Sequence, residues 1–104
     1  MDGAAPLDFE VAKIARVLGK RRTDSEVVVT RRGKTITVRA ARPGAAPGEA
    51  EQQPIAQFRG DGDGTYALHW SRATGGWESY GISGTLDECL EEVRRDAYGC
   101  FWGP

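Results

Sequence analysis

The feature that most constrains the fold of this chain is a series of strand-like segments with short connections. Residues with β-branched or aromatic side chains cluster between turn signals, and the predicted strands cover residues 26–30, 35–39, 55–58, 66–70 and 77–82. Parallel neighbours in a sheet need a connection of about a dozen residues or more, whereas antiparallel neighbours can be joined by a tight turn. The spacing therefore predicts an antiparallel meander of about five strands.

Two amphipathic helices are predicted to frame this meander. Apolar residues recur at helical spacing near each end of the chain, namely Leu7, Val11, Ile14 and Leu18 and then Leu86, Leu90, Val93 and Ala97. Thr85 and Glu88 have the spacing of a capping box, and Gly99 suits the C-terminus of the second helix. The order helix, strands, helix places the chain in the α+β class.

The chain carries two large aromatic residues, Phe101 and Trp102, shortly after the second helix. Large aromatic side chains left in water forgo the stabilisation that burial provides. We therefore expect the tail from Asp96 to Gly103 to fold back on the domain as a plug.

Length and composition indicate one domain. A chain of 104 residues has room for a single core. Residues 43–53 lack aromatic and β-branched side chains and are predicted to be a flexible loop inside that domain (1–104). No apolar run approaches the roughly 20 residues of a membrane span. We therefore expect a cytoplasmic protein and no membrane partner. Cys89 and Cys100 follow neither a disulfide framework nor a zinc spacing, so we expect both to be free thiols.

The first two strands are predicted to form a hairpin. With Arg32-Gly33 as a two-residue turn, the facing pairs are Val27 with Val38, Val29 with Ile36, Glu26 with Arg39 and Arg31 with Lys34. The first three pairs are favourable, whereas two like charges opposite each other are mildly destabilising. The needs of folding therefore do not explain Arg31 and Lys34.

The later strands carry most of the aromatic residues. Alternation predicts one apolar face, shared by Ala56, Phe58, Tyr66, Leu68 and Trp70. His69 then lies on the opposite face, and Trp77 and Tyr80 lie on different faces from each other. Because aromatic residues exposed on a sheet tend to be binding anchors, Trp77, Tyr80 and His69 are candidate protein-contact residues. Tyr66 and Trp70 are assigned to the core.

Charge is segregated along the chain, although the net charge is only −1. Residues 11–42 hold ten Lys or Arg residues against two acidic residues, and residues 43–104 hold four Arg residues against ten acidic ones. Five of the basic residues are candidates for one cationic patch that binds phosphate groups: Arg21, Arg22, Arg31, Arg32 and Lys34. The alternative is that they dock on the acidic face of the second helix, formed by Asp87, Glu88, Glu91 and Glu92.

Two short strings resemble ligand-binding motifs. Asp61-Gly62-Asp63-Gly64-Thr65 copies the middle of a calcium-binding loop, but the first and last ligand positions would be Arg59 and Trp70, so a hairpin turn is predicted. Gly33-Lys34-Thr35 resembles the end of a phosphate-binding loop but lacks the earlier glycine that the motif requires. His69 is the only histidine, and no nucleophile and base can be assembled around it. We therefore expect no catalytic residue, no metal, no cofactor and no enzymatic activity.

Four segments give the chain a family resemblance. Residues 54–58, 66–70, 77–80 and 96–103 contain spaced Trp and Tyr residues and a terminal Gly-Cys-Phe-Trp-Gly. In these features the chain resembles the bacterial proteins grouped as domain of unknown function 3024. The resemblance covers nearly the whole chain and implies a small stand-alone bacterial protein, but it supplies no catalytic residue.

Together these patterns predict a small cytoplasmic α+β protein that binds a protein partner and performs no chemistry. The alternative function is that of a nucleic-acid-binding accessory protein. It would use the basic residues at the end of the first helix and in the first hairpin.

Overall fold

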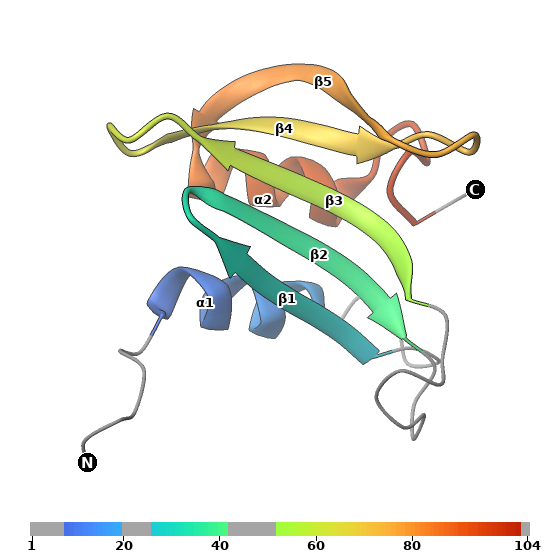
Figure 1. Ribbon diagram of the computed structural model, residues 1–104, viewed down its shortest axis with the longest axis horizontal. Coiled ribbons are helices and arrows are strands. Elements are labelled where there is room, and N and C mark those ends of the chain that lie inside the picture. The colour runs from blue at the N-terminus through green and yellow to red at the C-terminus, as the bar shows by residue number, and fades with distance from the viewer. Residues whose placement is uncertain (1–7, 20–25, 42–51, 103–104) are drawn as a thin grey trace.

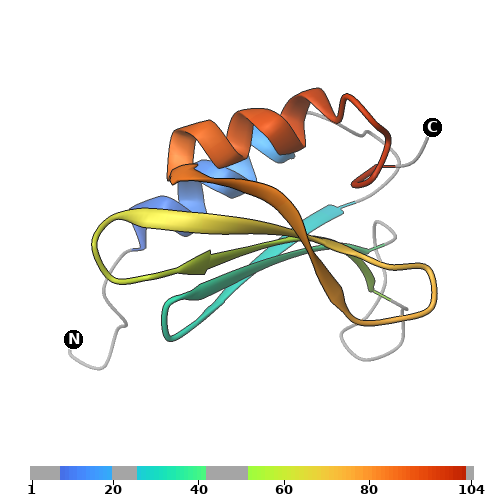
Figure 2. The ribbon, with the colours of Figure 1, turned by 90° about the horizontal axis from the view of Figure 1, so that it is seen from above.

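The computed structural model describes residues 8–19, 26–41 and 52–102. They form an antiparallel sheet with two helices on one of its faces (Figure 1 and Figure 2). The elements in chain order are α1 (Phe9–Leu18), β1 (Glu26–Arg32), β2 (Thr35–Ala41), β3 (Gln53–Gly60), β4 (Thr65–Ser71), β5 (Trp77–Thr85) and α2 (Leu86–Arg95). The sheet has five strands in the order β1-β2-β3-β4-β5, and every neighbouring pair is antiparallel. The predicted α+β meander is thus confirmed.

Side-chain caps define where both helices begin. The N-cap residue of α1 is Asp8, whose carboxylate accepts from the backbone N–H of Val11 at 3.1 Å. At the start of α2, Thr85 and Glu88 form the predicted capping box through reciprocal hydrogen bonds of 2.8 and 3.2 Å. Helix α1 packs against β1, whereas α2 packs against β3, β4 and β5. Each helix therefore covers a different part of the same face of the sheet.

The core lies between the helices and the sheet. Its largest fully buried side chains come from both layers: Ile14, Leu18, Ile36, Val38, Ile55, Phe58, Leu68, Cys89 and Val93. Strand β4 shows the predicted alternation, since Tyr66 and Leu68 are buried and Trp70 packs against the core. Phe58 lies directly opposite Leu68, so the predicted shared face of β3 and β4 is confirmed.

The first hairpin differs from the prediction in its register. The turn is Gly33-Lys34 rather than Arg32-Gly33, so Val29 pairs with Val38 and Arg31 pairs with Ile36. Gly33 has a φ of +61°, and a two-residue hairpin turn that begins with glycine accommodates this conformation better than one that begins with arginine. The shift amounts to two positions and therefore leaves each side chain on its predicted face.

In this register the charged residues that the sequence predicted to face each other, Glu26 with Arg39 and Arg31 with Lys34, are no longer opposite each other. Glu26 pairs with Ala41, and Arg39 pairs with Val28. The predicted pairing of Glu26 with Arg39 is therefore wrong, as is the juxtaposition of two like charges next to the turn.

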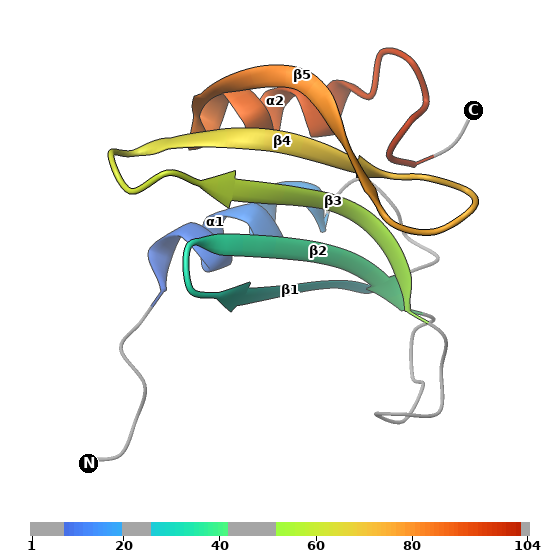
Figure 3. The same ribbon diagram turned by 45° about the horizontal axis from the view of Figure 1, so that its top comes forward.

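Strand β5 bends over the rest of the sheet (Figure 3). Its pairing with β4 shifts between Ala67 and His69, and Gly81 in the irregular stretch has a φ of +88°. Trp77 pairs with Ser71 and lies on the face away from the helices. Tyr80 packs on the helix side instead, with its ring centroid 5.0 Å from that of Phe101. The prediction that Trp77 and Tyr80 lie on different faces is confirmed.

The tail folds back, as predicted, and an aspartate holds it. The carboxylate of Asp96 accepts from the backbone N–H groups of Phe101 at 3.0 Å and Trp102 at 2.9 Å. The indole Nε1 of Trp102 donates to the carbonyl oxygen of Val93 at 2.9 Å and so satisfies one of the unpaired carbonyls at the end of α2. Phe101 is buried in the core.

The predicted C-terminal end of α2 is wrong. Helix α2 ends at Arg95 because Asp96, its C-cap, adopts a left-handed conformation with φ +47°. Ala97 is therefore exposed and does not join the buried stripe, and Gly99 lies beyond the helix. The predicted loop at 43–53 lies outside the described residues except at its end, where Gln53 already pairs with Ala40 in β3. Leu7 also lies outside the described residues.

Candidate functional site

The face of the sheet opposite the two helices, called the open face below, carries polar and basic side chains. On β1, β2 and β3 these side chains line a hollow of about 560 Å³: Thr30, Arg32, Thr35, Thr37, Arg39, Gln57 and Arg59. They alternate with residues of the helix-covered face, as Arg39 does with Val38 and Arg59 with Phe58. The hollow is therefore built from the polar halves of three strands.

Three arginines surround this hollow, and none of the described carboxylates lines it. Arg32 on β1 and Arg59 on β3 lie on either side of Thr35 in β2, so their Cα atoms are about 10 Å apart at the usual strand spacing. Arg39 stands further along β2, about 13 Å from Thr35. Within the described residues, Arg32 and Arg39 form no ion pair. Positive charge therefore accumulates here on a chain whose net charge is −1.

Hydrogen bonds hold Arg59 in place over the sheet. Its Nε donates to Gln57 Oε1 at 2.6 Å, and Gln57 Nε2 donates to Thr37 Oγ1 at 3.2 Å. Because a guanidinium only donates, the bond from Arg59 also determines which end of the Gln57 amide faces it. The terminal nitrogens of Arg59 are not used by this bond and can donate to a ligand.

Arg31 lies on the helix-covered face, unlike its neighbour Arg32, and is already paired. It bridges two carboxylates at the start of α1, with Nε 2.6 Å from Asp8 Oδ2 and a terminal nitrogen 2.5 Å from Glu10 Oε1. The hydrogen bond with Asp8 raises the pKa of Arg31 and holds the pKa of Asp8 below its usual value. Glu10 also accepts from the Tyr66 hydroxyl at 2.9 Å, and burial raises the pKa of that hydroxyl. Arg31 therefore fastens the first hairpin to α1.

Three residues of the predicted cationic patch can be placed, and of these Arg31 lies on the helix-covered face. Arg32 faces the hollow, Lys34 lies at the hairpin tip over the β3–β4 turn, and Arg21 and Arg22 lie outside the described residues. The alternative, docking on the second helix, is wrong for Arg31, which contacts α1. Carboxylates of α2 pair elsewhere: Asp87 with Lys13, Glu91 with Arg94 and Glu92 with Arg95.

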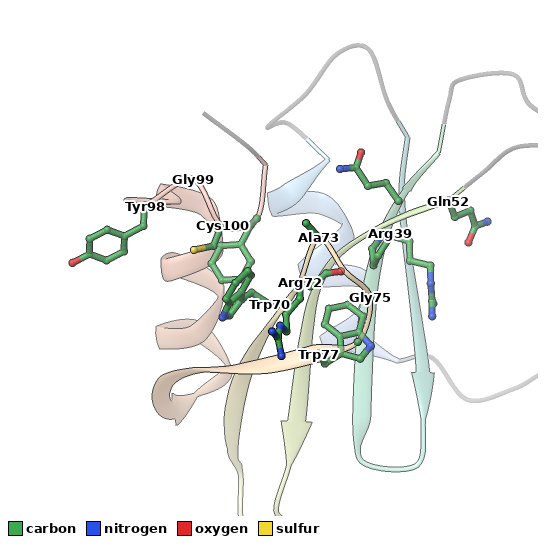
Figure 4. Close-up of a pocket in the computed structure, with 15 residues that line it drawn as sticks. Arg39, Gln52, Trp70, Arg72, Ala73, Gly75, Trp77, Tyr98, Gly99 and Cys100 are labelled. Atoms are coloured by element: carbon green, nitrogen blue, oxygen red, sulfur yellow. The ribbon is translucent and has the colours of Figure 1, made fainter.

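A second, larger hollow of about 860 Å³ adjoins the first. Its walls come from the ends of β2 and β3, the β4–β5 hairpin and the C-terminal tail. Figure 4 shows Trp70, Arg72 and Trp77 grouped at the hairpin, with Arg39 on β2 beyond them. Arg39 lines both hollows, so they adjoin at this side chain, and the surface from Arg32 past Arg39 to Trp77 is called the track below.

The three candidate protein-contact residues are divided between the two faces. Trp77 and His69 lie on the open face, where His69 pairs with Gln57 on one side and with Ser79 on the other. Tyr80 does not join them, because it packs against the core and its hydroxyl is buried without a hydrogen-bond partner among the described residues. The open face therefore combines part of the predicted aromatic set with part of the predicted basic set.

Sequence reasoning missed Arg39 and Arg59 as candidate site residues. A signal for them was present, since Thr35, Thr37 and Arg39 alternate with buried residues, and so do Gln57 and Arg59. Charges clustered along the chain do not indicate this site, because it gathers charges from neighbouring strands. The register of the strand pairs determines which of these side chains lie together.

The calcium-loop-like string forms the turn between β3 and β4. Asp61 and Asp63 accept hydrogen bonds from the backbone N–H groups of Asp63 and Thr65, respectively, in the turn between β3 and β4. Burial raises the pKa of Cys89, whose Sγ donates to the carbonyl oxygen of Tyr66. Among the described residues, no group of three or more His, Cys, Asp or Glu side chains is arranged to hold a metal ion. None of the described helices has the length and apolar character that a membrane crossing requires.

Fold and surface define a small α+β domain with one helix-covered face and one open, basic face. The chain belongs to the family described as Domain of unknown function (DUF3024), whose family model matches residues 5–103. This assignment agrees with the resemblance found in the sequence. No curated protein and no solved structure shows detectable similarity to the chain.

Proposed function

We propose that this protein is a non-catalytic binding module whose partner is anionic and contacts the open face of the sheet. The observation that carries the proposal is the hollow surrounded by Arg32, Arg39 and Arg59, without a carboxylate from the described residues. Arginine forms paired hydrogen bonds with phosphate and carboxylate groups, so the hollow suits a ligand with several negative charges.

The arrangement of the arginines supports a binding role over a folding role. Their side chains lie on the face away from the core, and like charges on neighbouring strands repel each other. Arg31 shows the contrast, because the carboxylates of Asp8 and Glu10 balance its charge. Positive charge that the fold does not neutralise is available to a partner.

A non-catalytic role and a cytoplasmic location in a bacterium are part of this proposal. His69 points Nδ1 at the carbonyl oxygen of Ala67, 3.3 Å away, and burial raises the pKa of Cys89, which disfavours the reactive thiolate. Both cysteines, Cys89 and Cys100, are free thiols, the usual state in a reducing compartment.

Retention on heparin-agarose tests the proposal, because heparin is a general polyanion. The wild-type protein should bind at about 50 mM NaCl and elute as salt screens the contacts. The triple variant Arg32→Ser, Arg39→Ser, Arg59→Ser should pass through the column.

The matched control removes three positive charges from the helix layer: Arg16→Ser, Arg94→Ser, Arg95→Ser. It has the same net charge as the first triple variant and should still be retained. Equal behaviour of the two triple variants would refute the open face as the binding surface.

A protein partner that uses Trp77 is the second candidate function. A tryptophan beside two arginines, Arg39 and Arg72, has the composition typical of interface hot spots. An acidic protein would supply the negative charge that the arginines of the open face require. This second candidate function therefore differs from the first in that the partner is a protein that also contacts Trp77.

A further inference from the structure

We propose that the open face binds single-stranded nucleic acid, with phosphates on Arg32, Arg59 and Arg39 and a base stacked on Trp77. This inference rests on the proposed function, since it names the ligand class of the same surface. It takes nucleic acid, not an acidic protein, as the partner.

Continuity of the surface is the first argument. Arg39 lines both the arginine hollow and the tryptophan hollow, so the two hollows adjoin at this side chain. Arg32 and Arg59 lie at one end of this track, and Trp77 on the far edge strand β5 lies at the other. An extended polymer fits such a track better than a single small anion does.

The chemistry along the track is the second argument. Proteins that bind single strands combine a basic groove for the backbone with aromatic rings on which bases stack. Arg59, which Gln57 holds through Nε, keeps its terminal nitrogens free to grip a phosphate in a fork. Gln57 itself uses both ends of its amide within the sheet and acts as a positioning residue.

The position of Trp77 favours a single strand over a duplex. Stacking on an indole requires a base that is free of its neighbours, and bases in a duplex are already stacked and paired. An acidic peptide offers charges for the arginines but no flat ring for the indole. A specific contribution from Trp77 therefore distinguishes the proposed ligand from both alternatives.

Fluorescence anisotropy with labelled oligonucleotides of about 12 nucleotides tests the inference, because site sizes on comparable surfaces are about 4 to 16 nucleotides. The ligands are oligo-dT, oligo-rU, a duplex of the same length and a polyglutamate peptide. Both single strands should bind more tightly than the duplex and the peptide. The ratio between the affinities for oligo-dT and oligo-rU shows whether the protein prefers single-stranded DNA or RNA.

Salt dependence separates the charge contribution from the stacking contribution. Three phosphate contacts predict a slope of log K against log salt of about −2, since each contributes roughly 0.7 for single strands. The open-face triple variant should lose this slope, and the Arg16, Arg94 and Arg95 control should keep it. Trp77→Ala should weaken binding about 5- to 150-fold without changing the slope, whereas Phe9→Ala, at an exposed aromatic on α1, should have no effect.

Trp77→Phe protects the test against a loss of folding, because it keeps an aromatic ring at this half-buried position. Oligonucleotide should quench the tryptophan fluorescence of the wild type, and Trp77→Phe should bind while losing that quenching. Identical quenching in both proteins, or equal affinity for single strand, duplex and polyglutamate, would overturn the inference. If the open-face triple variant then still lost heparin retention, the proposed function would stand without its nucleic-acid ligand.

Discussion

Replacing Asp96 by alanine is expected to destabilise this protein more than any exposed substitution, because one side chain holds the tail on the core. Asp96 is buried, and its two carboxylate oxygens accept separate hydrogen bonds from the N–H groups of Phe101 and Trp102. Hydrogen bonds to a charged group contribute about 1.5 to 3 kcal/mol each, and a buried donor left without a partner carries its own penalty. Alanine is also less tolerant than aspartate of the left-handed conformation at this position.

The expected loss is therefore about 3 to 5 kcal/mol of unfolding free energy. A domain of this size has only about 5 to 15 kcal/mol in total, and about 1 kcal/mol lowers the thermal midpoint by roughly 4 to 8 °C. Loosening the tail also withdraws the Trp102 indole from the carbonyl of Val93 and exposes Phe101. Asp96→Ala should thus melt more than about 12 °C below the wild type.

Urea denaturation followed by tryptophan fluorescence measures this effect, since Trp102 lies in the tail itself. Two further variants divide the contributions. Asp96→Asn keeps the tolerance for a left-handed conformation and one acceptor oxygen, so it should lose about half as much. Asp96→Gly relieves the backbone strain but also removes both hydrogen bonds, so its unfolding free energy should lie between those of Asp96→Asn and Asp96→Ala. A loss below about 1 kcal/mol for Asp96→Ala, or equal stability of all three variants, would refute the account of the tail.

Three other predictions follow from the described contacts. The hydrogen bond from Arg31 holds the pKa of Asp8 in the folded protein below its usual value near 4. The Asp8–Arg31 pair therefore stabilises the fold above about pH 4, and this stabilisation is lost as the pH falls through the folded-state pKa of Asp8. Asp8→Asn, which keeps a good N-cap, should be less stable than the wild type at pH 7 in urea titrations, and a gap that did not narrow toward pH 2 would contradict this pairing. A thiol reagent should modify the half-buried Cys100 before the fully buried Cys89, and Cys100→Ser should abolish the fast phase, whereas a persisting fast phase would show that Cys89 is accessible. Millimolar calcium should leave the thermal midpoint unchanged, because Asp61 accepts hydrogen bonds from its own turn; a rise of several degrees, absent in Asp61→Ala, would reveal a cation site.

Local sequence patterns determined most of the secondary structure. The alternation of Tyr66, Leu68 and Trp70 predicted a strand with one buried face, and Thr85 with Glu88 predicted where α2 begins. These signals are reliable because they act between residues that are close in the chain, through strand alternation and helix capping. The burial of the aromatic tail was also predicted, from its composition alone.

Boundaries and register depended on interactions that the sequence does not show. Helix α2 ends at Arg95 because the carboxylate of Asp96 reaches forward to Phe101 and Trp102, which requires the folded tail. The first hairpin turns one residue later than predicted, and the resulting shift places Arg31 opposite Ile36.

The candidate site was decided by tertiary structure. Arg31 and Arg32 are neighbours in the chain and look equivalent, yet alternation sends one toward α1, where Asp8 and Glu10 neutralise it, and the other onto the open face. Alternation alone predicts that neighbouring side chains point to opposite sides of a strand. Which side a helix covers, and where its carboxylates lie, depends on how the layers pack, so only the folded molecule determines which of the two arginines Asp8 and Glu10 neutralise.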